Sequence, residues 1–170
     1  MRKDSHVKKL VVMALLIAME IVLTRHLSVQ TPIARFSFGF LPIAVMGMLY
    51  GPLFAGLGAA VSDFVGVTLF PPLVGSFFPG FTLTAFLTGA VYGFLLKPKP
   101  VKMWRVCAAA LIVTLALNFI LDSFWLYIIL DRGVIALLPG RIIRTLIMFP
   151  IQIIGIRFVT SERFRSRIGE

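Results

Sequence analysis

The chain has 170 residues, of which 59% are hydrophobic, and a formal net charge of +10. A mean hydropathy of +0.98 is too high for a soluble domain of this size and predicts an integral membrane protein. The basic residues cluster at the termini and in a few loops, which favours positive-inside sorting over binding to nucleic acid. The single cysteine, Cys107, excludes an internal disulfide and a cysteine-based metal cluster.

The length allows roughly six membrane-spanning helices, because each needs about 20 residues. We therefore expect an all-α integral membrane protein whose residues 1–170 form one domain. The expected helices cover residues 7–25, 38–50, 52–70, 79–97, 105–130 and 138–158. In a six-span arrangement the basic clusters near the start, in the 97–105 loop and after Arg157 all face the cytosol. Both termini are then cytosolic, and a ligand pocket is expected to open to the outer face.

The first expected helix follows a short basic tail, residues 1–9. Ala14 and Ala18 lie one helical turn apart, and small residues at this spacing let another helix approach closely. Glu20 is costly in lipid and is expected to face protein or water, with Arg25 as its candidate partner near the outer end.

A long connection, residues 25–39, joins the first two helices and carries Arg25, His26, Arg35 and Phe36. Its mixture of polar and aromatic residues predicts an outer loop that folds back over the protein. In the third expected helix Asp63 is the one charged residue. A lone aspartate in a membrane helix indicates either a functional role or a pairing with an arginine elsewhere in the bundle.

The fourth expected helix starts after a segment, residues 71–76, whose prolines and glycine disfavour helix. This segment places Phe77 and Phe78 at the start of the helix, and Pro79 suits its first turn, where no N–H is needed. The hydroxyl of Thr82 can bond a neighbouring helix, its own backbone or a ligand.

In the fifth expected helix Asn118, Asp122 and Trp125 follow one another at spacings of four and three residues. These spacings place an amide, a carboxylate and an indole on one helix face. They indicate a ligand-binding face or, alternatively, an interhelical hydrogen-bond pair beside a tryptophan at the membrane interface.

The sixth helix is expected to start at Pro139-Gly140 and to carry Arg141 and Arg144 on one face of its first turns. Two guanidinium groups near a helix N-terminus form a good receptor for carboxylates, which arginine binds bidentately. The alternative is that both side chains extend to lipid headgroups.

The sequence resembles the folate-specific substrate-binding (S) components of energy-coupling factor transporters. The resemblance rests on the run FFPGFTLTAFLTG at residues 77–89, the Ala14-xxx-Ala18 pair, the six-span plan and the length. It implies a multi-pass protein of the bacterial plasma membrane that captures folate from outside. It also implies partners, namely a transmembrane coupling subunit and two cytosolic ATPase subunits. The chain has no Walker motif, so hydrolysis of ATP is not expected of it, and no cofactor is expected.

Folate combines a pterin edge rich in donors and acceptors, a planar benzoate and a glutamate tail with two carboxylates. The amide or carboxylate of the fifth helix can read the pterin edge, the aromatic residues can stack on its rings, and the arginines can hold the tail. This matching leaves the pose open. The candidate substrate-binding residues are Arg25, His26, Arg35, Phe36, Asp63, Phe77, Phe78, Thr82, Asn118, Asp122, Trp125, Arg141 and Arg144. The candidate partner-docking residues are Ala14 and Ala18.

Three other functions are alternatives. A structural or assembly protein would leave the outward cluster of aromatic, basic and acidic residues unexplained. An S component for another vitamin or small molecule would keep the helices and the alanine pair but need fewer arginines for a ligand tail. A membrane enzyme would need a catalytic constellation, which two histidines, one cysteine and no paired acidic motif at metal spacing do not supply. An enzyme is therefore not expected.

Overall fold

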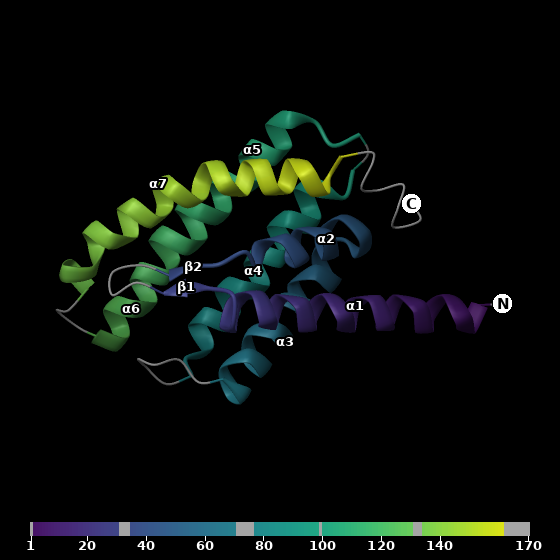
Figure 1. Ribbon diagram of the computed structural model, residues 1–170, viewed down its shortest axis with the longest axis horizontal. Coiled ribbons are helices and arrows are strands. Elements are labelled where there is room, and N and C mark those ends of the chain that lie inside the picture. The colour runs from purple at the N-terminus through teal and green to yellow at the C-terminus, as the bar shows by residue number, and fades with distance from the viewer. Residues whose placement is uncertain (1, 31–34, 71–76, 99, 131–133, 162–170) are drawn as a thin grey trace.

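The computed structural model describes residues 2–30, 35–70, 77–98, 100–130 and 134–161, without the side chains of residues 2–6, 29–30, 35, 130 and 134–137. The described chain is helical apart from two strands of two residues each (Figure 1). The helices are α1 (Arg2–Arg25), α2 (Phe40–Tyr50), α3 (Pro52–Leu69), α4 (Pro79–Leu96), α5 (Met103–Leu111), the π-helix η1 (Ile112–Leu121), α6 (Asp122–Leu130) and α7 (Val134–Val159). The strands β1 (Val29–Gln30) and β2 (Arg35–Phe36) pair antiparallel, with Val29 opposite Phe36.

Four helices are long and apolar enough to cross a membrane. They cover Pro52–Leu69, Pro79–Leu96, Met103–Ile129 and Leu138–Val159, and Phe40–Tyr50 is a shorter apolar helix. Large apolar side chains point outward from them, such as Phe94 at 74% and Ile154 at 70% exposure. An outward apolar surface of this kind suits a molecule surrounded by hydrocarbon, where burial of apolar groups does not drive helix association.

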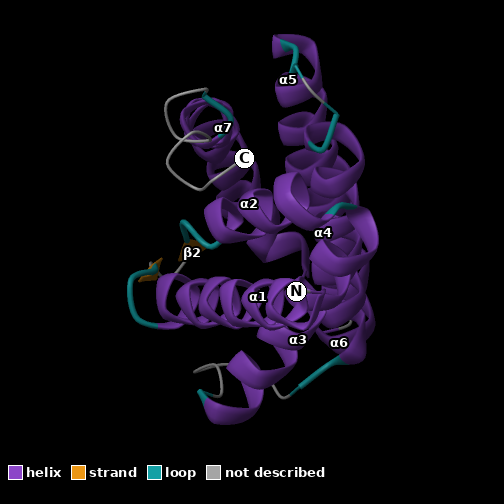
Figure 2. Cartoon of the chain, turned by 90° about the vertical axis from the view of Figure 1, so that its right-hand side faces the viewer, coloured by secondary structure: helices purple, strands orange, loops and turns teal. Residues whose placement is uncertain are grey.

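Helix α1 is longer than predicted, because the basic tail is helical from Arg2. Arginine and lysine are good helix formers, and no proline or glycine interrupts residues 2–25. The N-terminal part of α1 projects beyond the other helices (Figure 1). The C-terminal end of α7 lies at the same end of the molecule, and β1 and β2 form a small ribbon at the side of the helical body (Figure 2).

The last two helical segments also differ from the prediction. Residues 103–130 are continuously helical as expected, but the middle of the run, Ile112–Leu121, is a π-helix. Helix α7 begins at Val134, so the expected start at Pro139 is wrong and that proline lies inside the helix. Proline fits best in a first turn, but neighbouring groups in a membrane bundle can satisfy the carbonyl that an internal proline leaves free.

Helices α3 and α4 make the most extensive contact in the fold, and glycine makes it possible. A Cβ on Gly89 would lie 2.2 Å from the backbone oxygen of Ala55, and one on Gly93 would lie 2.4 Å from Cα of Pro52. The expected turn between α2 and α3 is present at Gly51, whose φ of 87° favours glycine. The α2–α3–α4 part of the bundle is therefore packed with backbones in contact.

Candidate functional site

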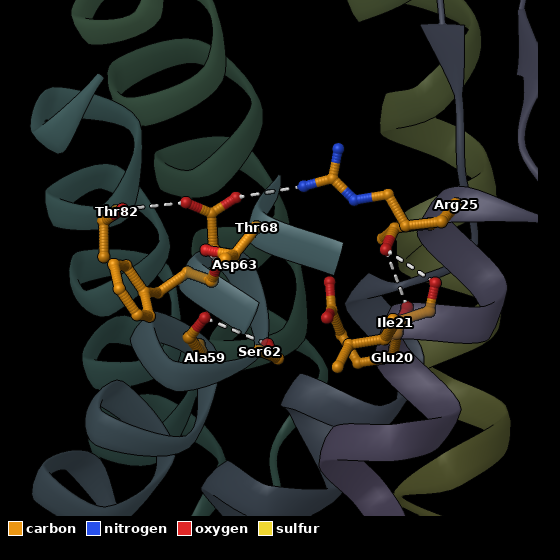
Figure 3. A network of polar contacts seen from close by, with 10 residues as sticks. Glu20, Ile21, Arg25, Ala59, Ser62, Asp63, Thr68 and Thr82 are labelled. Atoms are coloured by element: carbon orange, nitrogen blue, oxygen red, sulfur yellow. Dashed lines mark hydrogen bonds and ion pairs between the residues drawn. The ribbon is translucent and has the colours of Figure 1, made fainter. Parts of the chain in front are cut away.

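Three predicted site residues from three helices bind one another. Arg25 Nη2 in α1 lies 3.7 Å from Asp63 Oδ1 in α3, and Thr82 Oγ1 in α4 donates to Asp63 Oδ2 at 2.9 Å (Figure 3). Gly66 allows this approach, because a Cβ there would lie 3.0 Å from Arg25 Nε. Arg25 thus forms its ion pair with Asp63, and Glu20, one turn earlier in α1, is buried within the protein. The network links α1, α3 and α4, as the pairing alternative for Asp63 predicted.

A cluster of aromatic rings joins the start of α4 to α6. The indole of Trp125 donates from Nε1 to Thr84 Oγ1 at 3.1 Å, and its ring centroid lies 5.7 Å from that of Phe78 and 5.3 Å from that of Phe124. A Cβ on Gly80 would lie 2.5 Å from the Phe78 ring and 2.6 Å from the Trp125 ring. Glycine at this position therefore lets the two aromatic residues meet.

The other loop candidates lie apart from this cluster. Phe77 contacts Phe64 edge-on with centroids 5.4 Å apart, and His26 contacts Phe70 in the same way at 4.9 Å. Phe36 in β2 is partly buried against the core. The side chain of Arg35 and the expected loop at residues 71–76 lie outside the described parts of the chain.

A cavity lies between η1 and α7. Its empty volume is about 310 Å³, counted with the part that is open to solvent. Three predicted residues line it, namely Asn118, Arg141 and Arg144. Asn118 belongs to the π-helix, a rare geometry that is frequent at functional sites. The structure thus brings the amide of the fifth predicted helix and the arginines of the sixth to one cavity.

The charged groups at this cavity are only partly satisfied by the protein. Arg141 Nη2 donates to the backbone oxygen of Asn118 at 2.5 Å, and Asp122 interacts electrostatically with both Arg141 and Arg144. Within the described part of the chain, Arg141 Nε and Asp122 Oδ1 are buried without a hydrogen-bond partner. Buried polar atoms are normally hydrogen-bonded, and unsatisfied ones call for a specific explanation. Since Arg141 lines the cavity, its free donor can bind a polar ligand there.

The sequence-based prediction missed four residues that line the cavity, namely Thr114, Thr145, Met148 and Gln152. Three of them could have been found, since Thr145, Met148 and Gln152 follow Arg141 at spacings of four, seven and eleven residues along α7. Such spacings keep residues on one helix face. Gln152 is also a polar residue within an apolar run, which is itself a signal in a membrane helix.

Comparisons with known proteins place this chain in a family. The family described as "ECF transporter, substrate-specific component" matches residues 8–157. The folate transporter FolT of Clostridium novyi (strain NT) is 44% identical over 150 residues, which cover 88% of this chain and 86% of that protein. The FolT of Leuconostoc mesenteroides subsp. mesenteroides is 36% identical over 152 residues, covering 86% and 80%. A crystal structure of FolT bound with folic acid superposes with a TM-score of 0.80 at 41% identity, covering 87% of this chain and 88% of that one. The chain therefore belongs to the family of substrate-specific components of energy-coupling factor transporters, whose members bind substrates in a membrane and are not enzymes, as the sequence predicted.

Proposed function

We propose that the chain is the membrane subunit that captures folate from outside the cell and delivers it through an ATP-driven energy-coupling factor complex. The observation that carries the proposal is the cavity between η1 and α7, which is lined by Arg141 and Arg144 and where Arg141 Nε is buried without a hydrogen-bond partner in the described chain. Similarity to two folate transporters and to a FolT structure with folic acid supports folate as the ligand.

The chemistry of the cavity suits the parts of folate. The guanidinium groups of Arg141 and Arg144 suit its carboxylates, since arginine binds carboxylate bidentately. The carboxylate of Asp122 and the amide of Asn118 suit the donors and acceptors of the pterin edge. Trp125, three residues from Asp122 in α6, offers an aromatic face, and stacking adds about 0.5–1.5 kcal/mol beyond area burial.

The proposed orientation follows the distribution of basic residues. The N-terminal end of α1 and the C-terminal end of α7 lie at one end of the molecule. Lys97 and Lys102 lie in the loop between α4 and α5, and Arg105 lies in the first turn of α5. The positive-inside rule favours a single membrane domain in a bacterial plasma membrane, with both termini and this loop in the cytosol. The cavity then opens toward the outer face.

Coupling to the transport machinery is proposed to use α1. Ala14 and Ala18 are exposed on this helix, with Leu15 at 65% and Met19 at 48% exposure beside them. The two alanines therefore do not pack inside the described bundle. Their small side chains leave room for a helix of a transmembrane coupling subunit. Two cytosolic ATPase subunits would supply the energy that a chain without a Walker motif does not generate.

The proposal is tested by titrating the purified protein with folic acid and with pteroic acid, which lacks the glutamate tail. Folic acid should bind more tightly, and Arg141→Ala should weaken its binding by about 1.5–3 kcal/mol, the value of a hydrogen bond to a charged group. Pteroic acid should lose far less affinity. If the wild-type protein binds neither compound, the proposed ligand is wrong, and the small molecule that co-purifies with the chain, identified by mass spectrometry, would replace it.

A further inference from the structure

A hydrogen bond between α4 and α7 orients one of the residues that line the cavity. Tyr92 is fully buried, Gln152 is 3% exposed, and the tyrosine hydroxyl donates to Gln152 Oε1 at 3.2 Å. A buried hydroxyl is normally hydrogen-bonded, so this contact satisfies Tyr92. It also directs the carbonyl end of the amide toward Tyr92, which leaves the two N–H donors of Gln152 Nε2 on the other side of the group.

Gln152 lines the cavity at a different level from the arginines. Arg141 and Gln152 are eleven residues apart in α7, which corresponds to about 16 Å along a helix that rises 1.5 Å per residue. The cavity wall along α7 therefore has a charged end at Arg141 and an uncharged end at Gln152. Met148, which lies one turn from Gln152, is buried and has no N–H or O–H to donate.

The two threonines that line the cavity donate their hydroxyl hydrogen bonds to the backbone of their own helices. Thr114 Oγ1 donates to the backbone oxygen of Ala110 at 2.5 Å, and Thr145 Oγ1 donates to that of Arg141 at 2.9 Å. Each hydroxyl can then only accept from a ligand. Among the described residues that line the uncharged end, Gln152 is thus the side chain that supplies N–H donors.

We propose that Gln152, oriented by Tyr92, is a specificity-determining residue that donates a hydrogen bond to an oxygen acceptor at one end of the bound ligand. Tyr92 is a positioning residue, since it acts through the orientation of the amide. This inference deepens the proposed function and rests on it. In folate two groups offer such an oxygen, namely the 4-oxo group of the pterin ring and the carboxylates of the tail.

Three ligands distinguish these two oxygens. Folic acid has both, aminopterin carries a 4-amino group in place of the 4-oxo group, and pteroic acid lacks the glutamate tail. Gln152→Met keeps the side-chain length but removes the N–H donors, and should weaken folic acid binding by about tenfold. If the ring oxygen is the acceptor, the loss should disappear with aminopterin and persist with pteroic acid. If a carboxylate of the glutamate tail is the acceptor, the loss should disappear with pteroic acid, whose one carboxylate is on the benzoate ring, and persist with aminopterin.

Tyr92→Phe provides the second variant. It removes the hydroxyl that orients the amide, so it should weaken folic acid binding by a smaller factor than Gln152→Met, with the same dependence on the ligand. In the double variant Tyr92→Phe should add nothing to Gln152→Met, because it has no amide left to orient. Thr160→Val is the matched control, since Thr160 is a buried polar residue of the same region that donates to its own helix, and it should leave all affinities unchanged.

Two results would overturn the inference. One is an equal loss of affinity for all three ligands, which would indicate a general role of the Tyr92–Gln152 contact in packing. The other is unchanged affinity for folic acid in folded Gln152→Met and Tyr92→Phe proteins. Either result leaves the proposed function intact as long as the wild-type protein binds folic acid, whereas failure of the wild type to bind it would reject the proposed function itself.

Discussion

Two regions of this helical bundle bring charged side chains from different helices together, and the regions differ in how closely those charges are paired. On the α1–α3–α4 side, Asp63 faces Arg25 and receives the hydroxyl of Thr82, so the carboxylate has an ionic partner and a hydrogen bond. At the cavity between η1 and α7, Arg141 interacts electrostatically with Asp122 but forms no ion-pair contact with a described residue. Arg141 Nε is buried without a hydrogen-bond partner in the described chain, as is Arg25 Nε on the other side. A charge in a membrane helix is therefore not in itself evidence for a binding site. We propose that the charges held in the close ion pair of Arg25 and Asp63 serve the fold and that the charges at the cavity serve the ligand.

The largest effect on stability is expected at the close contact between α3 and α4. Gly89→Val would place side-chain atoms against the backbone of α3, since even a Cβ would lie 2.2 Å from Ala55 O. Backbone cannot move aside as a flexible side chain can, so we expect a loss of more than about 3 kcal/mol of stability and little folded protein on size-exclusion chromatography. Phe94→Leu on the same helix is the control, because Phe94 is 74% exposed. A stable, folic-acid-binding Gly89→Val protein would contradict the close contact of α3 and α4.

The next effect should separate transport from binding. Ala14→Trp or Ala18→Trp places a bulky group on the exposed face of α1, which should block docking of the coupling subunit and abolish ATP-driven folate uptake by the reconstituted complex. Folic acid binding to the isolated subunit should stay nearly unchanged, because neither alanine lines the cavity. Leu15→Trp places the same bulky group at a neighbouring exposed position. It tests whether docking depends on the small side chains of Ala14 and Ala18 in particular. Joint loss of binding and uptake would indicate that the pair serves the fold.

A smaller effect is expected at the aromatic cluster of Phe78, Phe124 and Trp125. Gly80→Ala would place its Cβ 2.5 Å from Phe78 and 2.6 Å from Trp125, so one ring must move. We expect a shift in tryptophan fluorescence and a several-fold weaker affinity for folic acid, in line with the loss of one stacking contact. Gly155→Ala would also place its Cβ against side chains, 2.9 Å from both Leu41 and Phe40, but outside this cluster, and it should leave the affinity unchanged. Equal effects of the two substitutions would argue against a role of the aromatic cluster in binding.

Much of the fold follows from signals that act within a few residues. Apolar runs and the Gly51-Pro52 turn located α2, α3 and α4 to within one or two residues. In hydrocarbon the backbone groups of an apolar segment must be hydrogen-bonded within that segment, so an apolar run predicts a helix. The start of α7 was missed because proline marks a preferred position and not an obligatory boundary, and the π-helix has no sequence signature that we could read.

The site was predictable only in part for a different reason. Asn118, Arg141 and Arg144 were found because each is conspicuous in an apolar helix. The partner of a residue depends on which helices are neighbours, which a single sequence does not reveal. The pairing of Asp63 with Arg25 and the contact of Tyr92 with Gln152 join helices that are distant in the chain, so the first remained one of two alternatives and the second was not predicted.

The most direct test of the difference between the two regions substitutes one arginine in each by glutamine. Melting temperature and folic acid affinity are measured for Arg25→Gln and Arg144→Gln in the purified protein. Arg25→Gln removes the partner of a largely buried carboxylate and should lower the melting temperature by about 5 °C or more with little change in affinity. Arg144→Gln should weaken folic acid binding by about tenfold or more with a much smaller change in melting temperature. The reverse pattern, or equal losses of both properties in both variants, would contradict the assignment of the paired charges to the fold and of the cavity charges to the ligand.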